Sequence, residues 1–400
     1  MSRAGRCMLC CVVVVAVTVL ASIQRLGLPA SIIREPISMN KLLAKRGKDQ
    51  SQEHKGTRVS YKQDESCNNR TCLWEKQQLY RKGLAWDMCS ALHAHGADTH
   101  HHPPRYRLDE SRNKTRLASM FNFFLVIDSL KLIYCFIPKV GSTSWERLFL
   151  VMSGIYDSME EIGQSETHII TWRTFRTLAS YTVAEAEKLL ATYRKFVVVR
   201  NPYERVLSAY QDKFQEDYPA SRVTRKQYSE KIIRMTGGSP ENVQRLLQSQ
   251  RRKDGTLNVT FSQFVRFLSH LGGPKTRQYM NDHWKPMNLI CHPCLVDYDW
   301  IGHYDSLRTD ADFILTAVGA DPKFRFPNFT TNPTGSSNGD TLLRYYSTLT
   351  TAEIEDLYKY YELDFSLFGF DIPPSIRSLL NNRGRANDYT TIDQTRLPVT

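Results

Sequence analysis

Residues 134–145 read Tyr-Cys-Phe-Ile-Pro-Lys-Val-Gly-Ser-Thr-Ser-Trp, and residues 196–210 read Phe-Val-Val-Val-Arg-Asn-Pro-Tyr-Glu-Arg-Val-Leu-Ser-Ala-Tyr. Each segment is an apolar run that ends in a turn with a cation and small or hydroxyl residues, followed by a helical pattern. In this arrangement a strand delivers a loop to a helix N-terminus, where free N–H groups and the helix dipole favour an anion. Two such sites on one sheet predict a ligand with two separated phosphate-like groups.

The first segment has the composition of a phosphate-binding loop. The apolar run over 131–137 predicts a buried parallel strand, and Pro138 ends its hydrogen-bond ladder. Gly141 allows the backbone to approach a ligand closely, and residues 142–144 supply hydroxyls and a cap for a helix predicted over 145–152. The segment lacks the Gly-Lys-Ser/Thr ending of a Walker A sequence, whose hydroxyl holds magnesium, and this disfavours a metal-dependent kinase.

The second segment follows the same logic. Residues 195–199 predict another buried strand, and Arg200 at its carboxyl end can bind a phosphate in a bidentate manner. Further helical patterns cover Val183–Tyr193, Tyr203–Phe214, Phe261–Leu271 and Ala352–Tyr361. The pattern predicts a single α/β domain with a central, mostly parallel sheet and nucleotide loops at the carboxyl ends of its strands.

The segment Pro138-Lys-Val-Gly-Ser-Thr-Ser-Trp145 resembles the 5′-phosphosulfate loop of the Golgi carbohydrate sulfotransferases, and the second segment resembles their 3′-phosphate loop. Three later segments, over 283–286, 291–302 and 364–370, are similar to the same family in the same order. The closer match is the branch that contains the chondroitin and dermatan 4-O-sulfotransferases and the HNK-1 sulfotransferase. The resemblance covers roughly residues 130–372.

This resemblance implies a P-loop-like sulfotransferase domain whose sulfate donor is 3′-phosphoadenosine 5′-phosphosulfate, with no metal. Lys139 would point its ammonium at the sulfuryl group and the bridging oxygen, where a fixed cation stabilises the charge that grows as the bond breaks. Ser208 matches the family's second 3′-phosphate ligand. The implied donor-binding residues are Pro138, Lys139, Val140, Gly141, Ser142, Thr143, Ser144, Arg200 and Ser208.

Sulfuryl transfer to a sugar hydroxyl also requires an acceptor for the departing proton. His283 is the candidate catalytic base, because imidazole titrates near neutrality and residues 283–286 match the family. Three alternatives stay open: a structural His283 beside Trp284, or a carboxylate base at Glu146 or Asp282. Trp284 suits either stacking on a sugar or packing in the core.

Two positions depart from the family's usual pattern. Asn201 follows the arginine where many relatives have Asp or Glu. Asparagine keeps the ability to turn and to cap a helix but loses the charge, which predicts nucleotide binding with an altered position of Arg200. Asp305 stands at the acidic position of a Gly-x-x-Glu pattern that begins at Gly302, and its shorter side chain predicts a shifted contact.

The amino terminus predicts an entry into the secretory pathway. Residues 8–23 form an apolar run that follows Arg3 and Arg6; it is shorter than the roughly 20 residues of an average span, but thinner membranes accept it. We expect a cytoplasmic tail over 1–7 and a transmembrane signal-anchor over 8–23. A cleaved signal peptide is the alternative, since Ala21 and Ser22 are small.

The rest of the chain divides into a luminal stem over 24–115, polar and without sustained periodicity, a catalytic domain over 116–374 and a polar tail over 375–400. Residues 1–120 hold 20 Lys and Arg against 10 Asp and Glu, so most of the net charge of +12 lies outside the catalytic domain. The basic segment at 221–253 is consistent with either a solvated helical face or a binding surface for an anionic glycan. Its basic residues are Arg222, Arg225, Lys226, Lys231, Arg234, Arg245, Arg251, Arg252 and Lys253.

Cysteines and glycosylation sequons agree with a luminal location. The six cysteines after the apolar run are Cys67, Cys72, Cys89, Cys135, Cys291 and Cys294, an even number whose pairing the sequence leaves open. Cys135 lies in an apolar strand pattern that predicts a buried free thiol, and residues 291–294 predict a disulfide-containing turn rather than a zinc site. Sequons begin at Asn69, Asn113, Asn258 and Asn328.

The chain is therefore predicted to be a single-pass type II Golgi membrane enzyme that sulfates a glycan, with 4-O-sulfation of N-acetylgalactosamine in chondroitin or dermatan as the leading expectation. Alternative acceptors are N-acetylgalactosamine on N-glycans and the glucuronic acid of the HNK-1 epitope. A catalytically silent glycan-binding protein and a glycan kinase are the alternative classes. No nucleic acid partner is expected, and the sequence does not predict an oligomeric state.

Overall fold

A computed structural model describes residues 67, 69–94, 120–216, 219–272, 279–327 and 334–393. The predicted cytoplasmic tail and signal-anchor lie outside these residues, as do most of the predicted stem and the sequons at Asn113 and Asn328. None of the helices in the described ranges combines the length and the apolar composition that a bilayer crossing requires.

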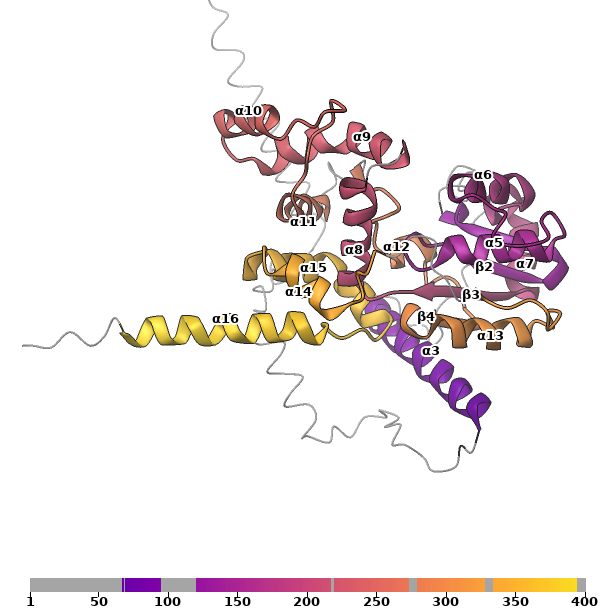
Figure 1. The fold of residues 1–400 in the computed structure, drawn as a ribbon. Coiled ribbons are helices and arrows are strands. Elements are labelled where there is room, and N and C mark those ends of the chain that lie inside the picture. Colours follow the sequence, from indigo (N-terminus) through magenta and orange to yellow (C-terminus); the bar gives the residue numbers. More distant parts are fainter. Residues whose placement is uncertain are drawn as a thin grey trace, which may run out of the picture. The chain divides into compact units, whose positions relative to one another are not determined.

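A four-stranded sheet forms the centre of the fold (Figure 1). Its strands are β1 (Phe124–Ile127), β2 (Leu132–Cys135), β3 (Arg194–Val199) and β4 (Trp300–His303), in that spatial order. The β2–β3 and β3–β4 pairs are parallel, as predicted, whereas β1 pairs with β2 in antiparallel fashion. The connection between β1 and β2 is only a 3-10 turn over 128–130, too short for the crossover that a parallel pair requires.

Helices make up most of the remaining described residues. Between β1 and β4 they are α5 (Ser142–Met152), α6 (Gln164–Thr174), α7 (Val183–Thr192), α8 (Pro202–Tyr210), a π-helix (Gln211–Gln215), α9 (Pro219–Thr236), α10 (Pro240–Ser249), α11 (Phe261–Ser269) and α12 (Asn288–Cys291). After β4 they are α13 (Leu307–Ala317), α14 (Gly339–Tyr346), α15 (Thr351–Leu367) and α16 (Pro374–Asp393). All the helices predicted from the sequence are present, with ends shifted by a few residues.

Aromatic side chains of α5 cover one face of the sheet. Tyr134 of β2 and Phe196 of β3 are register partners, and their rings stack at 4.7 Å. The Trp145 ring of α5 lies 4.8 Å from Phe196, and Phe149 lies 5.9 Å from Tyr134. All four side chains are fully buried, so the helix that follows the first loop is fixed against the two strands that carry the loops.

Part of the predicted stem belongs to the folded domain. Residues 70–94 form helix α3 (Arg70–Ala94), which contacts α15, β4 and α13 (Figure 1). Its buried residues, Trp74, Gln78, Arg81, Ala85 and Cys89, recur every three or four positions and so share one face of the helix. The sequence analysis did not predict this helix, because Gln78 and Arg81 on its buried face are polar and weaken the apolar pattern.

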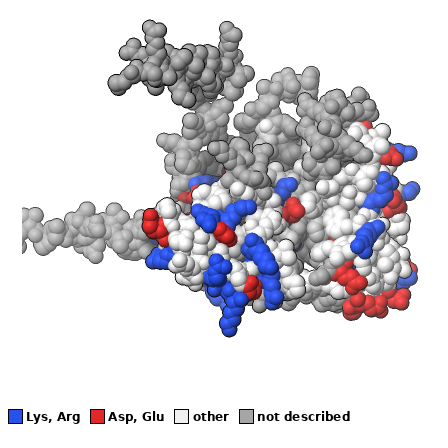
Figure 2. Space-filling model, turned by 90° about the horizontal axis from the view of Figure 1, so that it is seen from above, with Lys and Arg blue, Asp and Glu red and all other residues white. Residues whose placement is uncertain are grey.

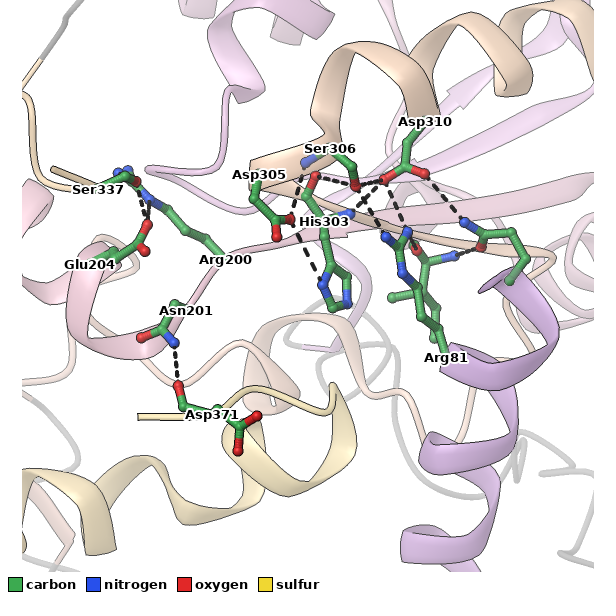
Figure 3. A network of polar contacts seen from close by, with 12 residues as sticks. Arg81, Arg200, Asn201, Glu204, His303, Asp305, Ser306, Asp310, Ser337 and Asp371 are labelled. Atoms are coloured by element: carbon green, nitrogen blue, oxygen red, sulfur yellow. Dashed lines mark hydrogen bonds and ion pairs between the residues drawn. The ribbon is translucent and has the colours of Figure 1, made fainter. Parts of the chain in front are cut away.

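A buried ion pair attaches α3 to α13. Arg81 lies 2.9 Å from Asp310, and both side chains are almost fully buried (Figure 3). The Asp310 carboxylate also accepts hydrogen bonds from the Trp74 indole at 2.8 Å, the His303 backbone at 2.9 Å and the Ser306 hydroxyl at 2.7 Å. The buried Asp310 carboxylate is therefore surrounded by one cation and three further hydrogen-bond donors, which offset the cost of its burial.

The predicted C-terminal tail is helical up to Asp393. Helix α16 begins at Pro374 and packs against α14. Ile376 and Leu380, one turn apart, are buried. The first turns of this polar segment therefore belong to the packed domain rather than to a peripheral tail.

Three disulfides connect the cysteines that follow the apolar run: Cys67–Cys72, Cys89–Cys294 and Cys135–Cys291. The prediction of a free thiol at Cys135 is wrong, because this buried strand residue pairs with the end of α12. The turn over 291–294 contains two disulfide cysteines, as expected, but each pairs with a distant element. One of them attaches α3 to the catalytic domain.

Candidate active site

The two predicted anion loops meet at one edge of the sheet. Because β2 and β3 are adjacent and parallel, the loops that follow them leave at the same end. A cavity of about 280 Å³ lies there. It is lined by Phe123, Phe136, Pro138, Lys139, Gly141, Ser142, Thr143, Ser144, Gln164, His168, Trp172, Arg200, Ser208, Asp212, Lys213, Asp282, His283, Tyr304 and Thr334. The sequence-predicted site residues are all in this set except Val140, whose side chain is buried in the core.

The first loop has an unusual backbone. Lys139 adopts φ +73° and Gly141 adopts φ +86°, both in the left-handed region. A Cβ atom at Gly141 would lie 2.6 Å from the Leu307 side chain, so only glycine fits there. Helix α5 begins at Ser142, and its first-turn N–H groups therefore face the cavity beside residues 142–144.

Lys139 forms an ion pair that the sequence did not predict. Its ammonium lies 3.0 Å from the Asp212 carboxylate, which also lies 3.1 Å from the Lys213 ammonium. Burial lowers the pKa of Lys139, and Asp212 offsets part of this change. Burial raises the pKa of Asp212, but Lys139 and Lys213 outweigh it and hold that pKa below its usual value. The site thus holds two cations around one carboxylate.

Arg200 is held by several partners at the end of β3. Its guanidinium donates to the Lys139 carbonyl at 3.1 Å and to the Ser336 hydroxyl at 2.8 Å. It also donates to the Ser337 hydroxyl at 2.8 Å (Figure 3). It also stacks on the Tyr304 ring at 4.0 Å. The side chain is buried and its direction is fixed before any ligand is bound. Ser208 also lines the cavity, where its hydroxyl accepts from Thr334.

Asn201 caps helix α8 as the sequence predicts. Its side-chain oxygen accepts from the Tyr203 backbone, and its amide donates to the Asp371 carbonyl at 2.8 Å (Figure 3). The carboxylate beside Arg200 comes instead from Glu204, at 3.4 Å. The Asp305 side chain is 83% exposed, lies 4.0 Å from Nδ1 of His303 and is outside the cavity lining.

Arg205, on the helix after the second loop, is fully buried. It donates to the carbonyls of Pro138 at 3.0 Å, Lys285 at 2.7 Å and Asp282 at 2.8 Å. One guanidinium therefore joins the first loop to the segment that carries His283. No sequence pattern predicts these contacts, because all three acceptors are backbone carbonyls from distant parts of the chain.

His283 lines the cavity in a neutral form. Asn281 Oδ1 accepts from the His283 backbone N–H at 3.0 Å and lies 2.7 Å from Nδ1, so Nδ1 carries the hydrogen. Burial, with the charges of Lys213 and Lys139, holds the pKa of His283 well below its usual value. The ring can accept a hydrogen bond, but its surroundings oppose a positive charge.

The other candidate residues, Trp284, Asp282 and Glu146, lie in different surroundings. Trp284 is fully buried and packs against Tyr228 and Phe264, so it belongs to the core and is not a sugar platform. Asp282 lines the cavity, and burial raises its pKa. Glu146 lies in the buried interior beneath His168.

The basic segment over 221–253 is only partly available to a ligand. Arg225 is buried and pairs with Asp254 at 3.2 Å, and Arg234 pairs with Glu230 at 2.6 Å. On the face drawn in Figure 2, side chains of both signs are interspersed. The interpretation as a solvated helical face with internal ion pairs therefore explains part of this segment.

Helix α6 supplies residues that sequence reasoning missed. Gln164, His168 and Trp172 recur every four positions and line the cavity together with Phe123 and Phe136. Their four-residue spacing places them on one face of a helix and could have been recognised in the sequence. The segment, however, lies outside the five segments that resemble the family. Tyr304 was missed in the same way, although it directly follows β4 at the edge where ligands bind in parallel sheets.

Comparison with known proteins agrees with this geometry. Residues 122–371 match the Sulfotransferase family. The chain belongs to the sulfotransferase family. It is 33% identical over 254 residues to carbohydrate sulfotransferase 11 of Rattus norvegicus, which covers 62% of this chain and 67% of the relative. Carbohydrate sulfotransferase 10 of Gallus gallus is 32% identical over 295 residues, covering 68% and 77%. No solved structure matches the chain.

Membership of the sulfotransferase family confirms the predicted enzyme class and implies 3′-phosphoadenosine 5′-phosphosulfate as the sulfate donor. The cavity suits such a ligand, because Lys139, Lys213 and Arg200 and the N-terminus of α5 face one space. Cations and helix N–H groups are what two phosphate groups require.

Proposed function

We propose that this sulfotransferase modifies a glycan hydroxyl, with the 4-O position of N-acetylgalactosamine in chondroitin or dermatan as its acceptor. The carbohydrate acceptor is supported by the relatives, which are named carbohydrate sulfotransferases. The observation that carries the proposal is the meeting of Lys139 and Arg200 in one cavity, on the loops after two adjacent parallel strands.

Most of the predicted donor-binding residues have a role in this proposal. The N–H groups over 141–144 hold the 5′-phosphate, and Arg200 with Ser208 holds the 3′-phosphate. Lys139 turns from Asp212 to the bridging oxygen, whose negative charge grows as the S–O bond breaks. A buried ammonium there stabilises the transition state more than the ground state.

The acceptor hydroxyl must lose its proton, and two imidazoles line the cavity to receive it. His283 presents Nε2, because Nδ1 donates to Asn281. His168 reaches the same cavity from α6. Either ring would lie within the space where a sugar meets the donor.

The proposal includes a Golgi membrane location with the catalytic domain in the lumen and a type II anchor over 8–23. The apolar run with arginines before it supports the anchor. Three disulfides support an oxidising compartment, because such bonds persist there and are rare in the cytosol.

Transfer of labelled sulfate by the purified chain tests the function. The acceptor panel contains desulfated chondroitin, dermatan, heparosan and N-glycans, and Lys139→Ala is assayed beside the wild type. We expect transfer to chondroitin or dermatan that disappears in the variant, with 4-O-sulfated disaccharides as the product.

Other outcomes identify the alternatives. Transfer to the N-glycan alone would replace the proposed acceptor and keep the mechanism. Binding of glycan without transfer would indicate a silent binding protein, and phosphate transfer from a nucleoside triphosphate with magnesium would indicate a kinase.

A further inference from the structure

The cavity wall has two chemically different parts. One part consists of the cationic loops that face the donor. The other is contributed by α6 and the strand ends beside it and carries the uncharged side chains of Gln164, Trp172, Phe123 and Phe136, together with His168. An acceptor sugar has an apolar C–H face and hydroxyl edges, which an aromatic surface with a few polar groups suits better than a cluster of cations does.

The aromatic rings in this second part form a continuous surface. The Trp172 ring lies 5.8 Å from Phe136 and 6.4 Å from Phe123, both edge to face. Phe136 in turn lies 5.9 Å from the His168 ring. Trp172 remains 37% exposed, so the surface is open to a ligand.

His168 is backed by a buried carboxylate. Its Nδ1 lies 2.7 Å from Oε2 of Glu146, which is completely buried, whereas the His168 side chain is 42% exposed. The Arg147 guanidinium donates to Thr167 at 3.2 Å and so fixes the register of α5 against α6. Burial of a carboxylate is costly without a partner, and His168 is the partner that the structure places against Glu146.

We propose that His168, oriented by Glu146, accepts the proton of the attacking sugar hydroxyl, and that the α6 side of the cavity holds the acceptor. This inference rests on the proposed function. The hydroxyl oxygen forms the new bond to sulfur while the bond from sulfur to the 5′-phosphate oxygen breaks. That oxygen keeps the electron pair, which yields adenosine 3′,5′-bisphosphate, and the proton moves to Nε2 of His168.

The surroundings of the two histidines favour His168 over His283. Lys139, Lys213 and Arg205 all act on His283 and oppose a proton there. His168 contacts the Glu146 carboxyl group of α5. Burial raises the pKa of Glu146, and His168 and Arg147 offset part of this change. A carboxylate in contact with an imidazole orients the ring and selects its tautomer. His283 is then a neutral ring that positions substrate.

Three variants test the assignment in the sulfate-transfer assay. We expect His168→Gln to lower kcat about 100-fold or more, the usual contribution of a general base, while the Kd for adenosine 3′,5′-bisphosphate stays unchanged. Added imidazole should restore part of the activity of His168→Ala. Glu146→Gln should lower kcat about ten-fold with little change in the KM for the acceptor, because the imidazole loses the carboxylate that orients it.

Nucleotide binding by each variant reports that it is folded, and His270→Gln, at an exposed position outside the cavity, is the matched control. Full activity of His168→Gln, or a kcat unchanged by Glu146→Gln, would overturn the assignment while the proposed function stands. A large loss in His283→Gln alone would give the role to His283. Failure of the wild type to sulfate any acceptor would remove both proposals.

Discussion

Oδ2 of Asp212 lies about equally close to the ammonium groups of Lys139 and Lys213 in the cavity proposed to bind the donor. This carboxylate fixes the direction of Lys139, but it also repels the phosphates that the site is proposed to bind. Its effects on binding and on chemistry therefore oppose each other.

Replacing Asp212 with asparagine separates these two effects. We expect Asp212→Asn to bind adenosine 3′,5′-bisphosphate about five-fold more tightly, since a negative charge is removed near the phosphates. We expect kcat to fall about ten-fold, since Lys139 loses its fixed partner. Calorimetry and initial rates measure the two changes, with Asp305→Asn as the exposed control. Weaker nucleotide binding in Asp212→Asn would contradict the electrostatic argument.

Three partly buried histidines make the stability of the protein sensitive to acid. Burial lowers the pKa of His292 to about 4 and that of His303 to about 3, and it also lowers the pKa of His283. Between roughly pH 6.5 and pH 4 the unfolded chain therefore binds more protons than the folded chain, and the free energy of unfolding falls as the pH falls.

We expect each such histidine to contribute a slope of roughly 1.4 kcal/mol per pH unit in this window. Urea denaturation at several pH values measures the slope. His303→Gln should reduce it, because one of the buried rings can no longer take up a proton on unfolding. A free energy of unfolding that is constant between pH 6.5 and pH 5 would exclude the argument.

At the level of single residues, the sequence predicted the parts of the site whose chemistry is local. Gly141, the hydroxyls after it and Arg200 stand next to their strands, so spacing alone places them. Asp212 and Arg205 were not predictable in their roles, because their partners come from distant segments and include backbone carbonyls. His168 had a candidate spacing but no motif to single it out.

Helix α3 shows the limit of periodicity as a signal. Its buried face includes Gln78 and Arg81, while Leu79 and Trp86 on other faces are exposed. Apolar residues are thus distributed around the helix, and no amphipathic pattern marks it. The strands β2 and β3 were predictable for the opposite reason, since strands buried on both faces read as continuous apolar runs.

The ion pair that anchors α3 has a measurable consequence. Arg81→Met should lower the free energy of unfolding by about 3–5 kcal/mol, because Asp310 would remain buried without its cation. The double variant Arg81→Met with Asp310→Asn should recover part of that loss, because no buried charge then lacks a partner and the amide oxygen can still accept from the Trp74 indole. Urea denaturation compares them, with Arg70→Met at the exposed start of α3 as the control. Equal stability of Arg81→Met and the wild type would show that α3 is not held in this way.

The whole folded domain is larger than the family match. The match begins at residue 122, whereas α3 begins at Arg70 and contributes Arg81 and Cys89 to contacts with β4, α13 and the turn at Cys294. We expect a fragment that starts at residue 60 to show a cooperative thermal transition and one that starts at residue 120 to aggregate. The yield of soluble monomer and the calorimetric transition measure this. A cooperative transition in the shorter fragment would show that α3 is dispensable.

The disulfide pattern also constrains how the chain matures. Ribosomes deliver residues in order, so Cys67 and Cys72 can close a small ring early, whereas Cys89 and Cys135 wait for partners that follow 205 and 156 residues later. Until those partners are synthesised, Cys89 and Cys135 can form a non-native disulfide with each other. This disulfide must then be exchanged before the native pairs Cys89–Cys294 and Cys135–Cys291 can form. Production of active enzyme is therefore coupled to the supply of a disulfide isomerase, and cells that lack one will accumulate a mispaired, inactive form.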